Sequence, residues 1–186
     1  LVQRTSGALT LHKGKVGGGF EPGVKVGTGW AQKRITVGPW ADSIYPTVIG
    51  VDRAGNVLSH QVSSKGKLGA GQMLGTGWKD RHVTMIDMAS TGRQGLLGRS
   101  RSKLIFQPTD GTGRFTGPEQ EVAGAGWSDT TALASVTAHY RGLNGVLSVK
   151  RSGALQYTSS YGTQFAGILR YPMDLRGSFL AGSRRF

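Results

Sequence analysis

The feature that most constrains the fold is a short stretch ending in tryptophan that recurs along the chain. Val26 to Trp30 reads VGTGW, Leu74 to Trp78 reads LGTGW, and Ala123 to Trp127 reads AGAGW. These tryptophans are 48 and 49 residues apart, and they are three of the four in the chain. A fixed period of this size is typical of repeat proteins, in which each repeat is one supersecondary unit.

Aligning the tryptophans brings further positions into register. Short apolar strand patterns begin near residues 6–12, 54–60, 102–107 and 152–158, so a fourth repeat starts although no tryptophan follows it. Alternating apolar residues after each tryptophan, such as Ile35 and Val37, indicate one more strand per repeat. The 31 glycines among 186 residues supply the tight turns that many short strands need.

Four antiparallel strands in each repeat predict an all-β fold, a propeller-like array of about four repeats. We expect a single domain over residues 1–186, with repeats at about 1–48, 49–95, 96–146 and 147–186. The chain starts inside a repeat, so we expect it to be part of a longer protein or a processed fragment. Four blades can close a ring alone, and a five-bladed ring is the alternative.

The last repeat is expected to be degenerate. Tryptophan is due 21 to 23 residues after Leu155, where the chain has Arg176, Gly177 and Ser178. Terminal repeats of such arrays often depart from the consensus in this way.

The recurring aromatic residues are interpreted as structural anchors. Glycine before each tryptophan allows a tight turn, and the indole is expected to pack between neighbouring blades. A role in stacking on sugars is the alternative, and it would require the tryptophans to be exposed. The expected anchors are Trp30, Trp78, Trp127, Phe20 and Phe115.

The order of strand, glycine-bearing turn, Gly-Trp and strand resembles the FG-GAP or VCBS-type repeats of secreted bacterial proteins, which are similar to tachylectin-type propellers. The resemblance is carried by SGALTLHKGKVGGGFEPGVKVGTGW at 6–30 and RSKLIFQPTDGTGRFTGPEQEVAGAGW at 101–127. It covers the chain from Leu1 to about Phe165. It implies a non-catalytic module, attached to a secreted hydrolase or displayed at the cell surface, and sugar binding between blades as in tachylectin-type members.

The loops after the tryptophans depart from that family, many of whose repeats hold an acidic calcium loop here. Residues 39–50 contain Asp42 alone, and residues 88–98 and 138–148 contain no carboxylate. A hard cation needs several oxygen ligands, commonly carboxylates. We therefore expect no calcium in these loops, and no metal or cofactor elsewhere.

The formal charge of +13, from 23 Lys and Arg against 10 Asp and Glu, favours anionic partners. We expect an anionic cell-wall polymer or glycan, with another envelope protein or the rest of the parent chain as further partners. Nucleic acid is disfavoured because neither a recognition helix nor a stacking motif accompanies the charge.

Two groups of residues are candidates for ligand binding. Arg93, Arg99 and Arg101 lie in the densest basic stretch, for which the alternative is a charged edge that discourages aggregation. Trp40 lies outside the repeat register and is expected to be an exposed aromatic residue. Tyr45 and Tyr140, in equivalent loops, are grouped with it.

No catalytic constellation is evident. His12 and His60 occupy equivalent positions, but Gln107 and Thr158 replace them in the other repeats, which favours solvated strand ends over a metal pair. An enzyme would become plausible if Asp80, Asp87 and His82 met in one pocket.

The expected function is attachment to a carbohydrate-rich bacterial envelope as part of an exported protein. The apolar runs are too short to span a membrane, and any export signal would lie upstream of residue 1. Two alternatives are a docking or structural subunit of an envelope complex and an accessory domain of a secreted cell-wall hydrolase.

Overall fold

The computed structural model describes residues 1–31, 33–41, 43–137 and 144–176, and these residues form four antiparallel β-sheets, here called blades 1 to 4. Blade 1 has β1 (Val2–Gln3), β2 (Leu9–Leu11) and β3 (Val24–Gly27). Blade 2 has β4 (Arg34–Gly38), β5 (Thr47–Val51), β6 (Val57–Gln61) and β7 (Gln72–Gly75). Blade 3 has β8 (Val83–Ile86), β9 (Gly95–Ser100), β10 (Lys103–Gln107) and β11 (Gln120–Ala123). Blade 4 has β12 (Thr130–Thr137), β13 (Asn144–Lys150), β14 (Leu155–Tyr161) and β15 (Gln164–Tyr171).

Strands follow one another in each sheet in chain order, every neighbour antiparallel. The predicted all-β, propeller-like array of four repeats is confirmed, and the described residues contain no helix. The sheets are offset from the sequence repeats by one strand. The repeat predicted at 49–95, for example, begins within β5, the second strand of its sheet. The described part of the chain has no apolar helix of the length that crossing a membrane requires.

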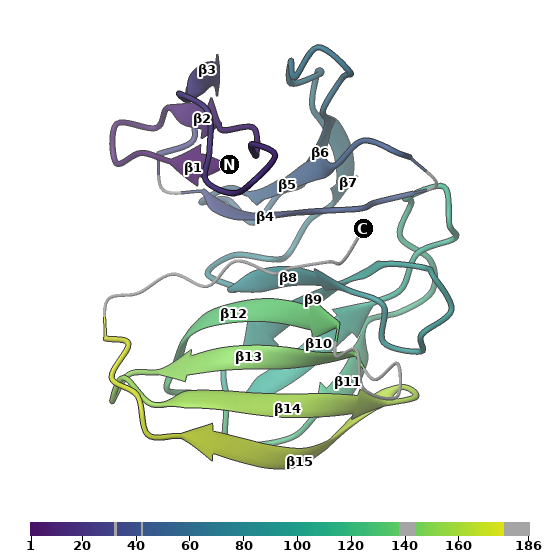
Figure 1. Cartoon of the computed structure of the whole chain (residues 1–186). Helices are drawn as coiled ribbons and strands as arrows, with labels where there is room; N and C mark the ends of the chain where they lie inside the picture. Colours follow the sequence, from purple (N-terminus) through teal and green to yellow (C-terminus); the bar gives the residue numbers. More distant parts are fainter. Residues whose placement is uncertain (32, 42, 138–143, 177–186) are drawn as a thin grey trace.

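The first strands of blades 2, 3 and 4 form the middle of the molecule. Figure 1 shows β4, β8 and β12 one beneath the other, and β8 contacts both of its neighbours. The Met85 amide donates a hydrogen bond to Thr36 Oγ1 at 3.3 Å, and the Ser135 amide donates one to Thr84 Oγ1 at 2.9 Å. A threonine hydroxyl on one inner strand therefore holds the backbone of the next.

Tryptophan side chains fill the interfaces between blades. The interface of blades 2 and 3 is typical, because Trp78 is buried, comes from blade 2 and lies on Gly98 of blade 3. A Cβ atom at Gly98 would be only 2.7 Å from Cζ3 of Trp78, so the close approach of the indole requires glycine there. The ring of Phe115 stacks on the same indole with 6.0 Å between centroids.

The other two interfaces repeat this arrangement. Trp30 of blade 1 is buried against Gly50 of blade 2 and packs in a cluster with Leu68. Trp127 of blade 3 is buried beside Phe165 of blade 4, with 6.4 Å between ring centroids. One hydrophobic cluster thus lies at each of the three junctions, and burial there stabilises the array.

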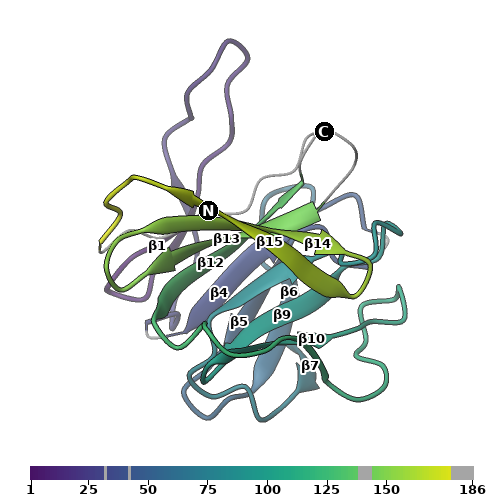
Figure 2. The same cartoon turned by 90° about the horizontal axis from the view of Figure 1, so that it is seen from below.

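Phe20 differs from the expected anchors. It lies on the hairpin that follows β2, drawn in purple and standing out from the body in Figure 2, and its side chain is 71 % exposed. The expectation that Phe20 anchors the repeat is wrong for this structure, because no described blade precedes blade 1 to supply a tryptophan.

The fourth repeat does contain a residue at the tryptophan position. The Leu175 amide donates to the Gly153 carbonyl at 2.9 Å, as the Trp30 amide does to Gly7 at 3.0 Å. Leu175 lies 20 residues after Leu155, one residue before the expected window, so the aligned residue there is leucine rather than Arg176.

Candidate functional site

The turns between the second and third strands of the blades lie on one side of the array, here called the turn face, which is to the left in Figure 1. Each repeat tryptophan is tied to the turn of its own blade by a backbone hydrogen bond. The acceptors for Trp30, Trp78 and Trp127 are the carbonyls of Gly7, Gly55 and Ser102, at 3.0, 3.0 and 3.1 Å. The residues that follow each tryptophan lead into the first strand of the next blade. The hydrogen bond therefore holds them beside the turn of the tryptophan's own blade.

This arrangement forms a cavity of about 400 Å³ at blade 2, here called the blade 2 pocket. Lys33 and Arg34 reach it from the start of β4, and Asp80 reaches it from the linker before β8. The last residue of β5 and the turn after it complete the lining with Val51, Asp52 and Arg53. The volume is that of a site for a small molecule, which usually measures about 300 to 1,000 Å³.

Two lining residues have their charged groups held in place. The Asp52 carboxylate accepts hydrogen bonds from Asn56 N and Asn56 Nδ2, both at 2.9 Å. The Asn56 side chain, followed by its backbone amide, holds the pKa of Asp52 below its usual range, so the group is anionic at neutral pH. Lys33 Nζ lies 4.8 Å from the centre of the buried Trp30 ring, a cation–π contact.

The other charged groups of the blade 2 pocket form no ion pair with one another or with other described residues. Within the part of the chain that the structure describes, none of Lys33, Arg34, Arg53 and Asp80 takes part in an ion pair. The pocket therefore presents donors and acceptors that are available to a ligand. It has three cationic side chains and two carboxylates, an excess of one positive charge.

A basic cluster lies next to the pocket and shares Arg34 with it. The Arg99 amide donates to the His82 carbonyl at 2.9 Å, and β4 and β8 are neighbours, so these strands bring the three side chains to one place. Burial, followed by the charges of Arg34 and Arg99, lowers the pKa of His82 to about 4, and its imidazole is neutral at pH 7. Burial first, then Arg34 and Arg151, also lowers the pKa of Arg99, which shows how much positive charge gathers here.

The part of blade 3 that corresponds to the blade 2 pocket is organised differently. We call this part of a blade its corner: the end of the second strand, the turn that follows it and the linker after the blade's tryptophan. The strand registers place Arg99 where blade 2 has Val51, since Gly98 pairs with Ile105 as Gly50 pairs with Leu58. Arg99 Nη1 donates to the carbonyls of Arg101 at 3.0 Å and Ser128 at 3.4 Å. The guanidinium thus bridges the turn and the linker that stand apart in blade 2.

The linker carboxylate of blade 3 is also neutralised. Asp129, the counterpart of Asp80, pairs with Lys150 at 2.7 Å, and Lys150 donates to the Gly126 carbonyl at 2.6 Å. The Asp129 pKa is lowered, chiefly by the hydrogen bond from Lys150. In blade 2, by contrast, the corresponding carboxylate, Asp80, makes no ion pair with any described residue.

The arrangement suits recognition of a polar ligand. Carboxylates and cationic donors within one small cavity can accept and donate hydrogen bonds to neighbouring hydroxyl groups, and charged partners give the stronger bonds. The described residues contain no group of three or more His, Cys, Asp or Glu side chains placed to hold a metal ion. Asp80 and Asp87 lie before and after β8, so the pocket with Asp80, Asp87 and His82 together does not form.

The expectation of an exposed aromatic residue at Trp40 is wrong. Its side chain is 3 % exposed, and its Nε1 donates to the Gly113 carbonyl at 2.9 Å. Trp40 lies ten residues after Trp30, as Met88 lies ten residues after Trp78, and both are buried in the junctions of their blades. Trp40 is therefore a variant of a repeat position, and the difference in residue type concealed the equivalence.

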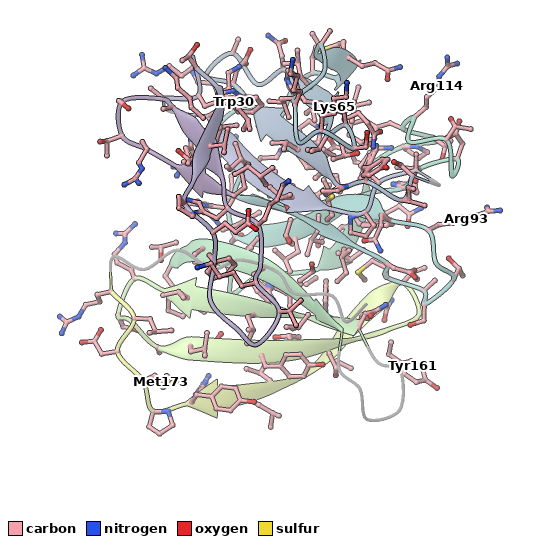
Figure 3. The ribbon with its side chains drawn as sticks, turned by 45° about the horizontal axis from the view of Figure 1, so that its top comes forward. Trp30, Lys65, Arg93, Arg114, Tyr161 and Met173 are labelled. Atoms are coloured by element: carbon pink, nitrogen blue, oxygen red, sulfur yellow. The ribbon has the colours of Figure 1, made fainter. Side chains whose placement is uncertain are left out.

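The remaining candidates are divided between two sides of the array. Tyr45, partly exposed, and Arg93 precede the second strands of blades 2 and 3, on the side opposite the turn face. Figure 3 shows Arg93 pointing away from the body on the same side as Arg114. Arg99 and Arg101 lie at the other end of β9, on the turn face. Tyr140 lies outside the described residues, as does Asp42.

Sequence reasoning missed most of the blade 2 pocket. Its residues come from three segments that are far apart in the repeat, and charge is spread over the whole chain. A signal was nevertheless present, because the residues two to four positions after a repeat tryptophan and the turn of the same blade share one side. Asp80 could have been grouped with Asp52 on this basis.

Comparison with known proteins supports the fold. No family model and no curated protein sequence matches the chain. Among solved structures it is similar to a lectin of Agrocybe aegerita with a β-propeller-type fold, a structure described as the basis of specific recognition of non-reducing terminal N-acetylglucosamine. The TM-score is 0.59 at 14 % identity, over 87 % of this chain and 46 % of the lectin chain. The chain thus spans about half the length of this lectin, and the likeness establishes a shared fold.

Proposed function

We propose that the chain is a non-catalytic, carbohydrate-binding propeller module and that the blade 2 pocket is its sugar site. The observation that carries this proposal is a set of charged groups, Asp80 and Arg53 among them, that make no ion pair with the described residues and line a cavity of about 400 Å³. A sugar ring presents adjacent hydroxyls, which such groups bind with paired hydrogen bonds. The fold that the chain shares with a lectin supports the proposal.

The preferred ligands are anionic glycans or cell-wall polymers. Arg34 belongs to both the pocket and the basic cluster with His82 and Arg99, so a sugar in the pocket lies in a positive local field. The net charge of +13 adds long-range attraction that weakens as salt is added. The local contacts select the sugar, and the overall charge brings the polymer to the protein.

The module is proposed to belong to an exported bacterial protein with FG-GAP or VCBS-type repeats, at the cell surface or secreted. The strand and turn order of the repeats supports that placement. A hydrolase accessory domain would use the same site to hold its substrate polymer, so both settings lead to one test of binding.

The test is calorimetric titration of the full chain with N-acetylglucosamine, glucuronic acid and a soluble teichoic acid, each at low and high salt. Arg53→Gln and Asp80→Asn should each weaken sugar binding about tenfold or more, because each removes a charged hydrogen-bond partner. The matched control is Arg101→Gln, which makes the same charge change in the turn of blade 3 and should leave monosaccharide binding unchanged.

Two results would overturn the proposal. One is polymer binding that disappears at high salt with no monosaccharide competing, which would assign attachment to net charge alone. The other is equal weakening by Arg53→Gln and Arg101→Gln, which would show that no local site is involved.

A further inference from the structure

Three arginines from successive blades lie close together on the turn face, beside the blade 2 pocket, and are here called the arginine row. They are Arg34 at the start of β4, Arg99 near the end of β9 and Arg151 in the turn after β13. Their positive charges act on one another, because burial, followed by the charges of Arg34 and Arg151, lowers the pKa of Arg99. The row therefore gathers the cationic side chains of blades 2, 3 and 4 in one place.

Hydrogen bonds to the inner strands hold the first half of the row. The Met85 amide donates to Thr36 Oγ1 at 3.3 Å, so Arg34, two residues earlier on β4, lies level with the start of β8. The Arg99 amide donates at 2.9 Å to the carbonyl of His82, the residue before β8. His82 is thus next to both arginines, whose charges rank after burial among the causes of its low pKa.

The linker between β11 and β12 holds the second half of the row. Arg99 Nη1 donates to the carbonyl of Ser128 at 3.4 Å. The Arg151 amide donates to the carbonyl of the next residue, Asp129, at 2.7 Å. Arg99 and Arg151 are therefore placed side by side by two adjacent peptide carbonyls.

The protein does not neutralise the arginine row. Within the described ranges, none of Arg34, Arg99 and Arg151 takes part in an ion pair. The Asp129 carboxylate beside the row is paired with Lys150 at 2.7 Å, and its effect on the pKa of Arg99 ranks last. Arg99 Nε is buried and has no hydrogen-bond partner among the described residues. A buried donor on a charged group is costly to leave unpaired, and a bound anion would offset that cost.

The chemistry of the row suits a tetrahedral oxyanion. A guanidinium group presents a planar fork of N–H donors that pairs with two oxygens of a phosphate at once. A carboxylate has two oxygens, so one such fork is enough to fill it. A phosphate or sulfate group has more oxygens and can pair with several guanidinium groups that approach from different blades.

We propose that the arginine row is an oxyanion subsite and that the glycan of the blade 2 pocket carries a phosphate or sulfate group which the row binds. The link to the glycan rests on the proposed function, since Arg34 lines both the pocket and the row. The subsite itself stands on the row alone and binds the free ions without any sugar. The pocket then holds the sugar ring, and the charged substituent points toward blades 3 and 4.

The first test uses the free ions. The full chain is titrated with sodium sulfate and with sodium phosphate, with chloride replacing them at constant ionic strength, while NMR follows the ring of His82. Binding should saturate, and sulfate, which stays a dianion, should raise the pKa of His82 from about 4 toward the usual 6.5, because a nearby anion stabilises the protonated ring. A pKa that is the same in sulfate as in chloride would overturn the proposal.

Substitutions in the row locate the subsite. Arg99→Gln and Arg151→Gln should each weaken sulfate binding about tenfold or more, because each removes a charged hydrogen-bond partner. Arg151 is exposed and its backbone makes the bond to Asp129, so its variant retains the fold. Arg114→Gln is the matched control, since it makes the same charge change on the side opposite the turn face, as Figure 3 shows. Equal weakening by all three variants would assign sulfate binding to net charge and overturn the proposal.

Sugar esters separate the subsite from the sugar site. The probes are N-acetylglucosamine and its 1-phosphate, 6-phosphate and 6-sulfate esters. At least one ester should bind about tenfold or more tightly than both the unsubstituted sugar and the free ion, and Arg151→Gln should remove most of this gain. Sulfate binding without any sugar binding would support the subsite and contradict the proposed function. Sugar binding with no gain from any ester and no ion binding would overturn the subsite and leave the proposed function standing.

Discussion

The corners of blades 2 and 3 on the turn face have the same backbone arrangement, but the first is an open cavity and the second is bridged by an arginine side chain. In blade 2, Val51 leaves a hollow lined by Arg53 and Asp80, whose charges are unpaired among the described residues. In blade 3, Arg99 stands at the Val51 position and bridges the turn and the linker. One side chain at an equivalent position thus separates a site that can take a ligand from a corner that the protein fills itself.

The first way to challenge this comparison is to remove the buried tryptophan that lies beside each corner, Trp30 in one case and Trp78 in the other. Trp30→Ala and Trp78→Ala should each lower the free energy of unfolding by about 3 to 5 kcal/mol, because each leaves a cavity between two blades. The measurement is urea unfolding of both variants beside wild type. If the losses of unfolding free energy in the two variants differ by more than about 2 kcal/mol, the two tryptophans do not have equivalent packing roles. A difference of that size would match the whole spread between a rigid site and one that relaxes into the cavity.

The second challenge is pH, which should distinguish the corners because only that of blade 3 contains His82. The folded pKa of about 4 lies below the usual 6.5, so the unfolded chain takes up the proton first as the pH falls. This contribution to stability is complete above about pH 6.5 and is lost progressively down to about pH 4. We expect a loss of about 2 kcal/mol, less than the full linkage value because His82 is partly solvated.

Unfolding curves of wild type and His82→Gln at several pH values measure this effect. The variant should lose the dependence between pH 6.5 and 4 while keeping any change at lower pH that comes from carboxylates such as Asp52 and Asp129. An unchanged dependence in His82→Gln would contradict the assignment.

The smallest effect is expected from copying the blade 2 residue into blade 3. Arg99→Val removes hydrogen bonds to two carbonyls but also relieves repulsion with Arg34 and Arg151, so the net cost should be about 1 kcal/mol or less. The pKa of His82 should rise, because Arg99 is one of the charges that lower it. An NMR titration of the His82 ring measures the shift, and an unchanged pKa would show that the two groups are not coupled.

The repeat architecture could be predicted from the sequence because the same packing position in successive blades is filled by the same type of residue. Trp30 and Trp78 pack on Gly50 and Gly98, and Trp127 fills the third junction beside Phe165, so the spacing of the tryptophans reveals the blades. Trp40 was misjudged because its equivalent is Met88, a residue of different chemistry that fills the same kind of space. Packing conserves volume and burial more strictly than residue type.

The candidate site could not be predicted in the same way. Whether Asp80 is free or paired depends on what stands nearby in space, and its counterpart Asp129 is paired only because blade 4 brings Lys150 to it. Leu175 was missed for a related reason, since its equivalence to tryptophan lies in a backbone hydrogen bond to Gly153. Such contacts leave no trace in the periodicity of one chain.

The packing of a tryptophan of one blade on a small residue of the next blade also bears on how such a chain can change during evolution. A segment of 48 or 49 residues contains one tryptophan and one small residue to receive the next, so an in-frame duplication inserts a blade that already fits both neighbours. Deletion of a whole segment closes the gap with the same contacts. Copy number can therefore drift without new interfaces, and the fourth repeat differs from the others because the smaller Leu175 stands where they have tryptophan.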